Sequence, residues 1–275
     1  MLIILIVSSL FGSKGNYGTQ KTTASLIAGG GTIGELIRFD SNNNGIPDWQ
    51  ESLYGLDPAG DGAKNKKIIE QKMTENGIDI SKTEQSDSPA TATDTFTKSL
   101  LSTILAMRQS GTLTTEAITN LAQTVDKNVD TKHAVAPSYT IVNIHVTTTP
   151  QAKETYATAL KKIIDKYSDL DIGTEMSIIA SGMADGHQDE LKQLGPIANA
   201  YTDISNKMVA LPTPKDAVED ALNLINATAQ MGVALEQVET LPTDAITGMV
   251  GIDDYLKASK ISDQASDNLN NYFNS

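Results

Sequence analysis

Cysteine is absent from the 275 residues of this chain, which excludes disulfides, thiol catalysis, cysteine-ligated zinc and lipid attachment through cysteine. Aromatic residues are few, with four Phe, one Trp and eight Tyr, so a core must consist mainly of aliphatic residues and Met. Basic residues are outnumbered by acidic ones, 21 to 34, which gives a formal net charge of −13. Phosphate backbones repel so acidic a chain, and we therefore expect no nucleic acid among its partners.

A long hydrophobic run is also missing, although the chain begins with an apolar segment. A membrane-spanning helix needs about 20 apolar residues, and the segment 1–11 supplies about half of that length. Three interpretations stay open: a signal-anchor helix cut short by the start of the sequence, an atypical secretion signal, or an apolar element packed on the domain. The first two predict an exported protein outside the cytoplasm, and the first also predicts an N-terminal membrane anchor. Segment 12–37 follows as a flexible spacer rich in Gly, Ser and Thr.

Hydrophobic periodicity predicts a mainly α-helical fold for most of the chain. Apolar residues recur at helical spacing, as at Ile118, Leu121 and Val125. We expect a bundle of about five to seven helices, preceded by a small calcium-loop module and a linker rich in Ser, Thr and Pro. The expected boundaries are 38–77 for the module with its short helix, 78–95 for the linker and 96–275 for the helical domain.

Local signals add detail to this expectation. Thr114 is the expected N-cap of a helix that carries Glu116 in its first turn. Tyr139–Val146 is the one segment with strand character, and we expect it to lie extended against helices or to pair with a short partner. Pro196, which follows Gly195, should bend or interrupt a helix.

One short segment carries readable metal chemistry. Residues 40–51 read DSNNNGIPDWQE and fit the pattern D-x-[DN]-x-[DN]-G-x5-E without a mismatch. Calcium is a hard cation that takes about six to eight oxygens at about 2.3–2.6 Å, so its ligands must converge from a tight turn. Gly45 permits that turn, and a glutamate at the start of a helix can close the site with both oxygens. The predicted ligands of one Ca²⁺ are the side chains of Asp40, Asn42, Asn44, Asp48 and Glu51 and the backbone carbonyl of Ile46.

Residues 40–61 resemble the calcium loops of thrombospondin type 3 repeats and their bacterial, EF-hand-like relatives. The turn Gly55-Leu56-Asp57-Pro58 stands where those loops often carry Gly-Thr-Asp-Pro. Trp49 directly follows the ninth-position Asp, as is common in the bacterial versions, and we expect it to pack the loop against a neighbouring element. The resemblance implies a Ca²⁺ cofactor for these residues and implies nothing about the helical remainder.

The sequence departs from such repeats after the turn. They usually occur in tandem, but lysines at 64, 66 and 67 stand where a second loop needs acids, so we expect no complete second site. Asp57 and Asp61 can either reach the first ion or cap the helix expected at Lys64–Glu75. Pro47 has no N–H to donate to a partner loop, which predicts a loop that works alone. Because three of the ligands are carboxylates, we expect weak binding, with a Kd of about 10⁻⁵–10⁻³ M.

Other acidic and histidine-containing stretches are interpreted as structural. Asp185, His187, Asp189 and Glu190 cluster at an expected helix start, where Gln188 completes a capping box and acids complement the helix dipole. No nucleophile-elbow, zinc-protease or Walker pattern occurs in the chain. We therefore assign no catalytic residue from the sequence.

Two functions fit these observations. The first is a calcium-binding, exported and membrane-tethered structural or interaction protein, whose helical domain meets a protein or cell-envelope partner. The alternative is an extracytoplasmic enzyme, such as a hydrolase, with a structural calcium site. A concave site with converging polar groups inside the helical domain would favour the enzyme.

Overall fold

The computed structural model describes residues 38–75, 96, 99, 100, 103, 104, 107, 113–128, 133, 135–170, 172–183 and 188–275. The predictions for segments 1–11, 12–37 and 78–95 lie outside these residues. Within them, the chain forms eight α-helices and two three-residue strands, which confirms the mainly α-helical fold. The helix count is slightly above the predicted five to seven, and two of the eight belong to the loop module.

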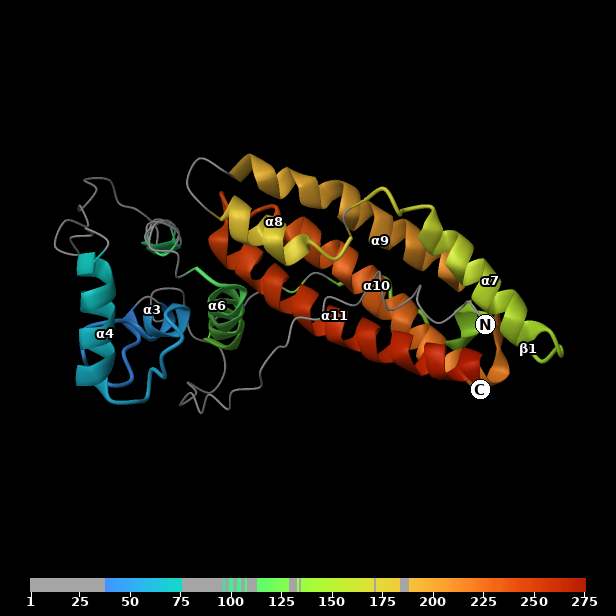
Figure 1. Ribbon diagram of the computed structural model, residues 1–275, viewed down its shortest axis with the longest axis horizontal. Helices are drawn as coiled ribbons and strands as arrows, with labels where there is room; N and C mark the ends of the chain where they lie inside the picture. The colour runs from blue at the N-terminus through green and yellow to red at the C-terminus, as the bar shows by residue number, and fades with distance from the viewer. Residues whose placement is uncertain are drawn as a thin grey trace.

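Two of these helices, α3 and α4, belong to the loop module, and the other six belong to the helical domain (Figure 1). Their bounds are α3 Asp48–Leu53, α4 Gly62–Glu75, α6 Thr115–Asn128, α7 Ala152–Asp165, α8 Glu175–Gly182, α9 Leu194–Val209, α10 Val218–Val238 and α11 Ala245–Asn274. Three 3₁₀ helices connect them, η2 Ile141–Asn143, η3 Gln188–Gln193 and η4 Lys215–Ala217. The strands β1 His145–Thr147 and β2 Pro212–Pro214 pair in parallel.

The long helices α9, α10 and α11 form the body of the molecule. The most extensive helix–helix contacts join α10 to α11 and α9 to α10, and α6 packs on α11. Figure 1 shows α6 standing between the loop module and one end of these long helices, while β1 lies at the opposite end, near the C-terminus. The helix α6 therefore connects the loop module to the bundle.

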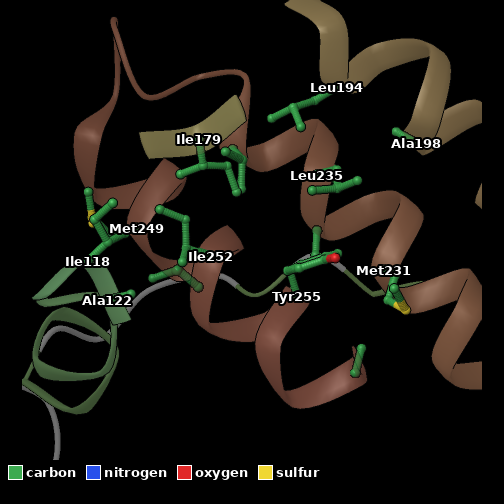
Figure 2. Packing of buried hydrophobic residues seen from close by; sticks show 14 of the residues in the cluster. Ile118, Ala122, Ile179, Leu194, Ala198, Met231, Leu235, Met249, Ile252 and Tyr255 are labelled. Carbon is green, nitrogen blue, oxygen red and sulfur yellow. The ribbon is translucent and has the colours of Figure 1, made fainter. Parts of the chain in front are cut away.

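Aliphatic side chains and methionines fill the core, as the shortage of aromatic residues predicts. In Figure 2, Ile118 and Ala122 of α6 point toward Met249 and Ile252 of α11. All four are buried, as are the predicted stripe residues Leu121 and Val125. Burial of each such Ile, Leu, Val or Met side chain contributes about 1.5–3 kcal/mol, so this packing is the main source of the stability of the bundle.

Two glycines allow the central helices to approach each other closely. A Cβ added to Gly251 of α11 would lie 2.7 Å from the carbonyl oxygen of Ala234 in α10. A Cβ on Gly232 of α10 would lie 2.9 Å from the carbonyl oxygen of Ala198 in α9. No side chain fits at such distances, so the backbones of α9, α10 and α11 are in direct contact at these points.

The local signals have mixed outcomes. The Oγ1 of Thr114 accepts a hydrogen bond from the backbone N–H of Ala117 at 3.1 Å, which confirms it as the N-cap of α6. The strand is shorter than its β-branched sequence predicts and spans only His145–Thr147, paired with a short partner. The helical stripe around Pro196 is divided, as expected, because the 3₁₀ helix η3 ends at Gln193 and α9 begins at Leu194. Pro196 itself lies in the first turn of α9, where it interrupts no hydrogen bond of that helix.

None of the helices in the described part of the chain is both long enough and apolar enough to cross a membrane.

Candidate metal centre

The loop between Asp40 and Asp48 folds as a tight turn that leads directly into α3. Asn43 and Gly45 have positive φ angles of 54° and 86°, so Gly45 provides the predicted sharp bend. The N–H of Asp48 donates to the carbonyl of Phe39 at 2.8 Å and closes the base of the loop. Because α3 begins at Asp48, Glu51 lies in its first turn, as the pattern predicts.

Two of the three carboxylates hold the loop backbone. Asp40 accepts hydrogen bonds from the N–H groups of Asn44 at 3.2 Å and Gly45 at 2.7 Å. Asp48 accepts from the N–H of Ser41 at 2.7 Å and from its hydroxyl at 2.6 Å. Burial raises the pKa of Asp48 above its usual range, and the two bonds from Ser41 offset only part of that rise. Each carboxylate thus stabilises one side of the turn.

The third carboxylate, Glu51, lies at the centre of the module and is 0% exposed. Its Oε1 accepts from three side-chain amides, those of Asn42 at 2.9 Å, Asn44 at 2.7 Å and Asn65 at 3.0 Å. Its Oε2 is buried as well, and none of the described residues donates a hydrogen bond to it. A buried carboxylate oxygen without a partner costs about 1–3 kcal/mol or more, so this atom is the point of the module where a further ligand or ion would gain most.

The structure brings some of the predicted ligands together and keeps others apart. Asn42, Asn44 and Glu51 meet, whereas Asp40 and Asp48 face the backbone of the turn. Ile46 has a buried side chain, and its N–H donates to the side-chain oxygen of Asn44 at 2.7 Å. Over the ranges that the structure describes, no three Asp, Glu, His or Cys side chains form a group placed to hold an ion. The six-ligand assignment therefore stays a prediction.

The residues present nevertheless suit calcium in their chemistry. The side chains of the predicted ligands are carboxylate and amide groups, whose oxygens are the ligands that a hard cation prefers. The buried Oε2 of Glu51 has a negative charge and no hydrogen-bond donor among the described residues. A divalent cation would satisfy that oxygen directly, so the fit rests on an observed atom and on the donor set.

The two acids that follow the loop, Asp57 and Asp61, accept hydrogen bonds from nearby backbone N–H groups. Asp61 Oδ1 accepts from the N–H of Lys64 at 3.1 Å, which makes Asp61 the N-cap of α4. Asp57 Oδ1 accepts from the N–H of Ala59 at 3.0 Å within a turn. Of the two alternatives that the sequence left open, the structure places Asp61 as a helix cap.

Asn65 is the residue that sequence reasoning missed. It lies on α4, is 6% exposed and reaches Glu51 from a point 14 residues further along the chain. Its N–H donates to the carbonyl of Asp61 at 2.9 Å, so the helix that Asp61 caps carries Asn65 one turn later. The spacing of Asp61 and Asn65, four residues apart after the turn, is the one feature of the sequence that points to Asn65. The lysines at 64, 66 and 67 obscure this feature.

The start of α4 is pressed against the loop. A Cβ on Gly62 would lie 2.8 Å from Oδ1 of Asn42, and the carbonyl of Gly62 accepts from the amide of Asn44 at 3.0 Å. A side chain at residue 62 would push the loop away from α4. The loop and α4 therefore form one packed unit.

Trp49 packs the loop against a neighbouring element, which confirms that prediction. Its side chain is 3% exposed, and its ring meets that of Phe96 edge-on with 5.5 Å between centroids. The helix α3 that carries Trp49 also contacts α6. The face of α3 opposite Glu51 is thus part of the same apolar cluster as the bundle.

A second group of charges lies where α6 meets α11. Lys257 Nζ is 2.8 Å from Asp126 and 2.6 Å from Asp253. His133 contacts both Asp126, at 3.3 Å, and Asp254, at 3.0 Å. Asp254 reaches this histidine from 121 residues further along the chain. A lysine already occupies the centre of this group, so its acids hold α6 to α11.

The acidic stretch expected at a helix start is described in part. Asp185 and His187 lie outside the described residues. Asp189 and Glu190 fall in the first turn of η3, as expected of helix-start residues, and Asp189 pairs with Lys192 at 2.5 Å.

A small cavity opens beside η3 and is almost wholly apolar. Gln188 is the one polar side chain among its ten lining residues, which include Leu191 and Met249. Its chemistry suits no polar substrate.

Comparison of this chain with protein-family models, with curated proteins and with solved structures found no match.

Proposed function

We propose that this protein binds one Ca²⁺ in its loop module and uses the ion to fix that module against a helical interaction domain. The buried, unpartnered Oε2 of Glu51 carries this proposal. It lies inside a loop whose residue pattern and oxygen donors suit calcium and no softer metal. The bound ion would be the positively charged partner of this oxygen.

Several residues of the loop would bind the ion together. Glu51 would hold the ion from the first turn of α3, and Asn42 and Asn44, which already contact Glu51, would present amide oxygens. The remaining ligands of the predicted set would be the side chains of Asp40 and Asp48 and the carbonyl of Ile46. Ordering of α3 would then fix the position of Trp49 on Phe96.

The setting that suits such a site is outside the cytoplasm. Three carboxylates predict a weak site, with a Kd of about 10⁻⁵–10⁻³ M, which fills only where calcium is abundant. The apolar segment 1–11 supports export and tethering to a membrane. The helical domain, acidic overall, would meet a protein or cell-envelope partner rather than nucleic acid.

Calorimetric titration of the purified protein with Ca²⁺ tests the site. We expect one ion per chain, and we expect Glu51→Gln to weaken binding at least tenfold, which is about 1.4 kcal/mol, because it removes the charge of the closing ligand. Glu70→Gln is the matched control, since Glu70 is an exposed carboxylate on α4 that pairs with Lys66. Equal affinity in wild type and Glu51→Gln would contradict the proposal.

Protease treatment of intact cells tests the location. We expect residues 96–275 to be cleaved in intact cells that lack an outer barrier, as they are in lysates. Protection in intact cells with cleavage after lysis would contradict export.

A further inference from the structure

We infer that Asn65 of α4 is a further calcium ligand, so that the site is completed from outside the 12-residue loop. This inference rests on the proposed function, because it concerns the same ion. It adds a residue that the loop pattern does not contain, and it assigns α4 a role in binding.

The position of Asn65 is the first argument. Its Nδ2 is 3.0 Å from Oε1 of Glu51, a distance close to those of Asn42 at 2.9 Å and Asn44 at 2.7 Å. The three amides therefore surround the same carboxylate oxygen at similar distances. Two of them belong to the predicted ligand set, and nothing in the geometry separates the third from them.

Burial is the second argument. Asn65 is 6% exposed and Glu51 is 0% exposed, so both groups lie away from solvent. A buried amide must find hydrogen-bond partners or ligands within the protein. Asn65 finds Glu51 and the carbonyl of Asp57, which is 2.7 Å from its Nδ2.

The chemistry of the carboxamide allows it to serve in both states of the site. Without the ion, the N–H groups of the three amides face Glu51 and partly offset its charge. Rotation about the terminal torsion exchanges the amide nitrogen and oxygen. For Asn65 it breaks the hydrogen bonds to Glu51 and to the carbonyl of Asp57, a cost that coordination of the ion must offset. With Ca²⁺ beside Glu51, the same rotation would offer the ion a neutral oxygen from α4.

The need for ligands is the third argument. Calcium takes about six to eight oxygens, and two of the predicted carboxylates, Asp40 and Asp48, are engaged with the backbone of the turn. An oxygen from Asn65 raises the number available near Glu51. Because Gly62 lets the first turn of α4 press against Asn42, the helix already holds Asn65 in place.

Calorimetric titration of the full chain with Ca²⁺ tests this inference. We expect Asn65→Ala to weaken binding about tenfold or more, and Asn65→Asp to tighten it, because the added charge lies beside the ion. Gln71→Ala is the matched control, since it removes an exposed amide from the same helix and should leave the affinity unchanged. Circular dichroism checks that each variant is folded.

The outcomes separate this inference from the proposed function. If Asn65 only donates a hydrogen bond to Glu51 in the ion-free protein, Asn65→Ala removes a competitor of the ion and affinity stays equal or rises. That result would overturn the inference and leave the calcium site in place. Absence of binding by both wild type and Asn65→Asp would overturn the proposed function and the inference together.

Discussion

In the loop module, the buried carboxylate of Glu51 accepts hydrogen bonds from three amide side chains. In the bundle, by contrast, α9, α10 and α11 pack through aliphatic side chains and through direct backbone contact at glycines. The centre of the module is a charge at Glu51 with an oxygen that no described residue satisfies. The centre of the bundle contains residues such as Leu235 and Met249 that need no partner beyond their neighbours. The stability of the module should therefore depend on ions in solution, and that of the bundle should not.

The two regions meet through α6, which contacts α3 on one side and α11 on the other. Trp49 and Phe96 add an aromatic contact to the first interface. Lys257 and Asp126 add an ion pair to the second. Substitutions in each region can therefore show whether calcium acts locally or through the whole molecule.

The largest expected effect comes from Leu235→Ala, because this side chain is fully buried in the bundle. We expect it to lower the free energy of unfolding by about 2–5 kcal/mol, measured by urea denaturation. The loss should be the same with Ca²⁺ and with chelator. Leu53→Ala is the matched variant in α3, and its cost should change with calcium, because α3 carries Glu51. Equal calcium dependence in both variants would show that the two regions are one unit.

A smaller effect should follow when the link between α6 and α11 is cut. Lys257→Met leaves two carboxylates, Asp126 and the buried Asp253, without their shared cation. We expect the free energy of unfolding to fall by about 1–3 kcal/mol at neutral pH. Lys260→Met, an exposed lysine on the same helix, should cost little.

The loss in Lys257→Met should shrink as the pH falls. Burial tends to raise the pKa of Asp126, but hydrogen bonds from Lys257 and Asp253 and the nearby positive charge hold it below its usual value. Without Lys257 that pKa rises above the unfolded value, so the folded variant binds more protons and regains stability in acid. Urea denaturation at neutral and acidic pH measures this. A loss that is independent of pH would contradict the ion-pair role.

The smallest effect concerns Asp263 of α11. Burial, and secondarily the charge of Asp267, raises its pKa to about 6. A raised folded pKa means that its favourable contribution is present below the unfolded pKa and is lost as the pH rises through about 6. Asp263→Asn should therefore stabilise the protein at neutral pH by less than about 1 kcal/mol, since solvent screens this half-buried group. The gain should vanish near pH 4, as thermal melting at both pH values would show.

Much of the fold follows from local patterns in the sequence. Ile118, Leu121 and Val125 share one face of α6 because helical spacing places them there, and all three are buried. The N-cap at Thr114 is also predicted by the residues next to it in the sequence. The interruption near Pro196 also follows from local sequence, but the apolar stripe alone does not show that the part before α9 is the 3₁₀ helix η3.

Features that join distant segments could not be predicted in the same way. The sequence identifies Glu51 and its loop, but Asn65 reaches Glu51 only after the chain turns at residues 57–61 and α4 folds back. The partner strand of His145–Thr147 contains two prolines, which suppress any strand signal in β2. The cluster around Lys257 depends on α6 and α11 packing side by side, and no short window of sequence contains both.

The backbone contact at Gly251 and Gly232 also has a consequence for how fast the molecule folds. The helices that touch there, α9, α10 and α11, are consecutive in the chain and are joined by short connections, so their contacts close small loops. Chains whose contacts are local fold fast, because little loop-closure entropy is lost before contacts form. The pairing of β1 with β2 and the docking of α6 on α11 join distant segments and should form later. The loop module contacts α6 through α3, so it can dock on the bundle only after α6 has packed on α11.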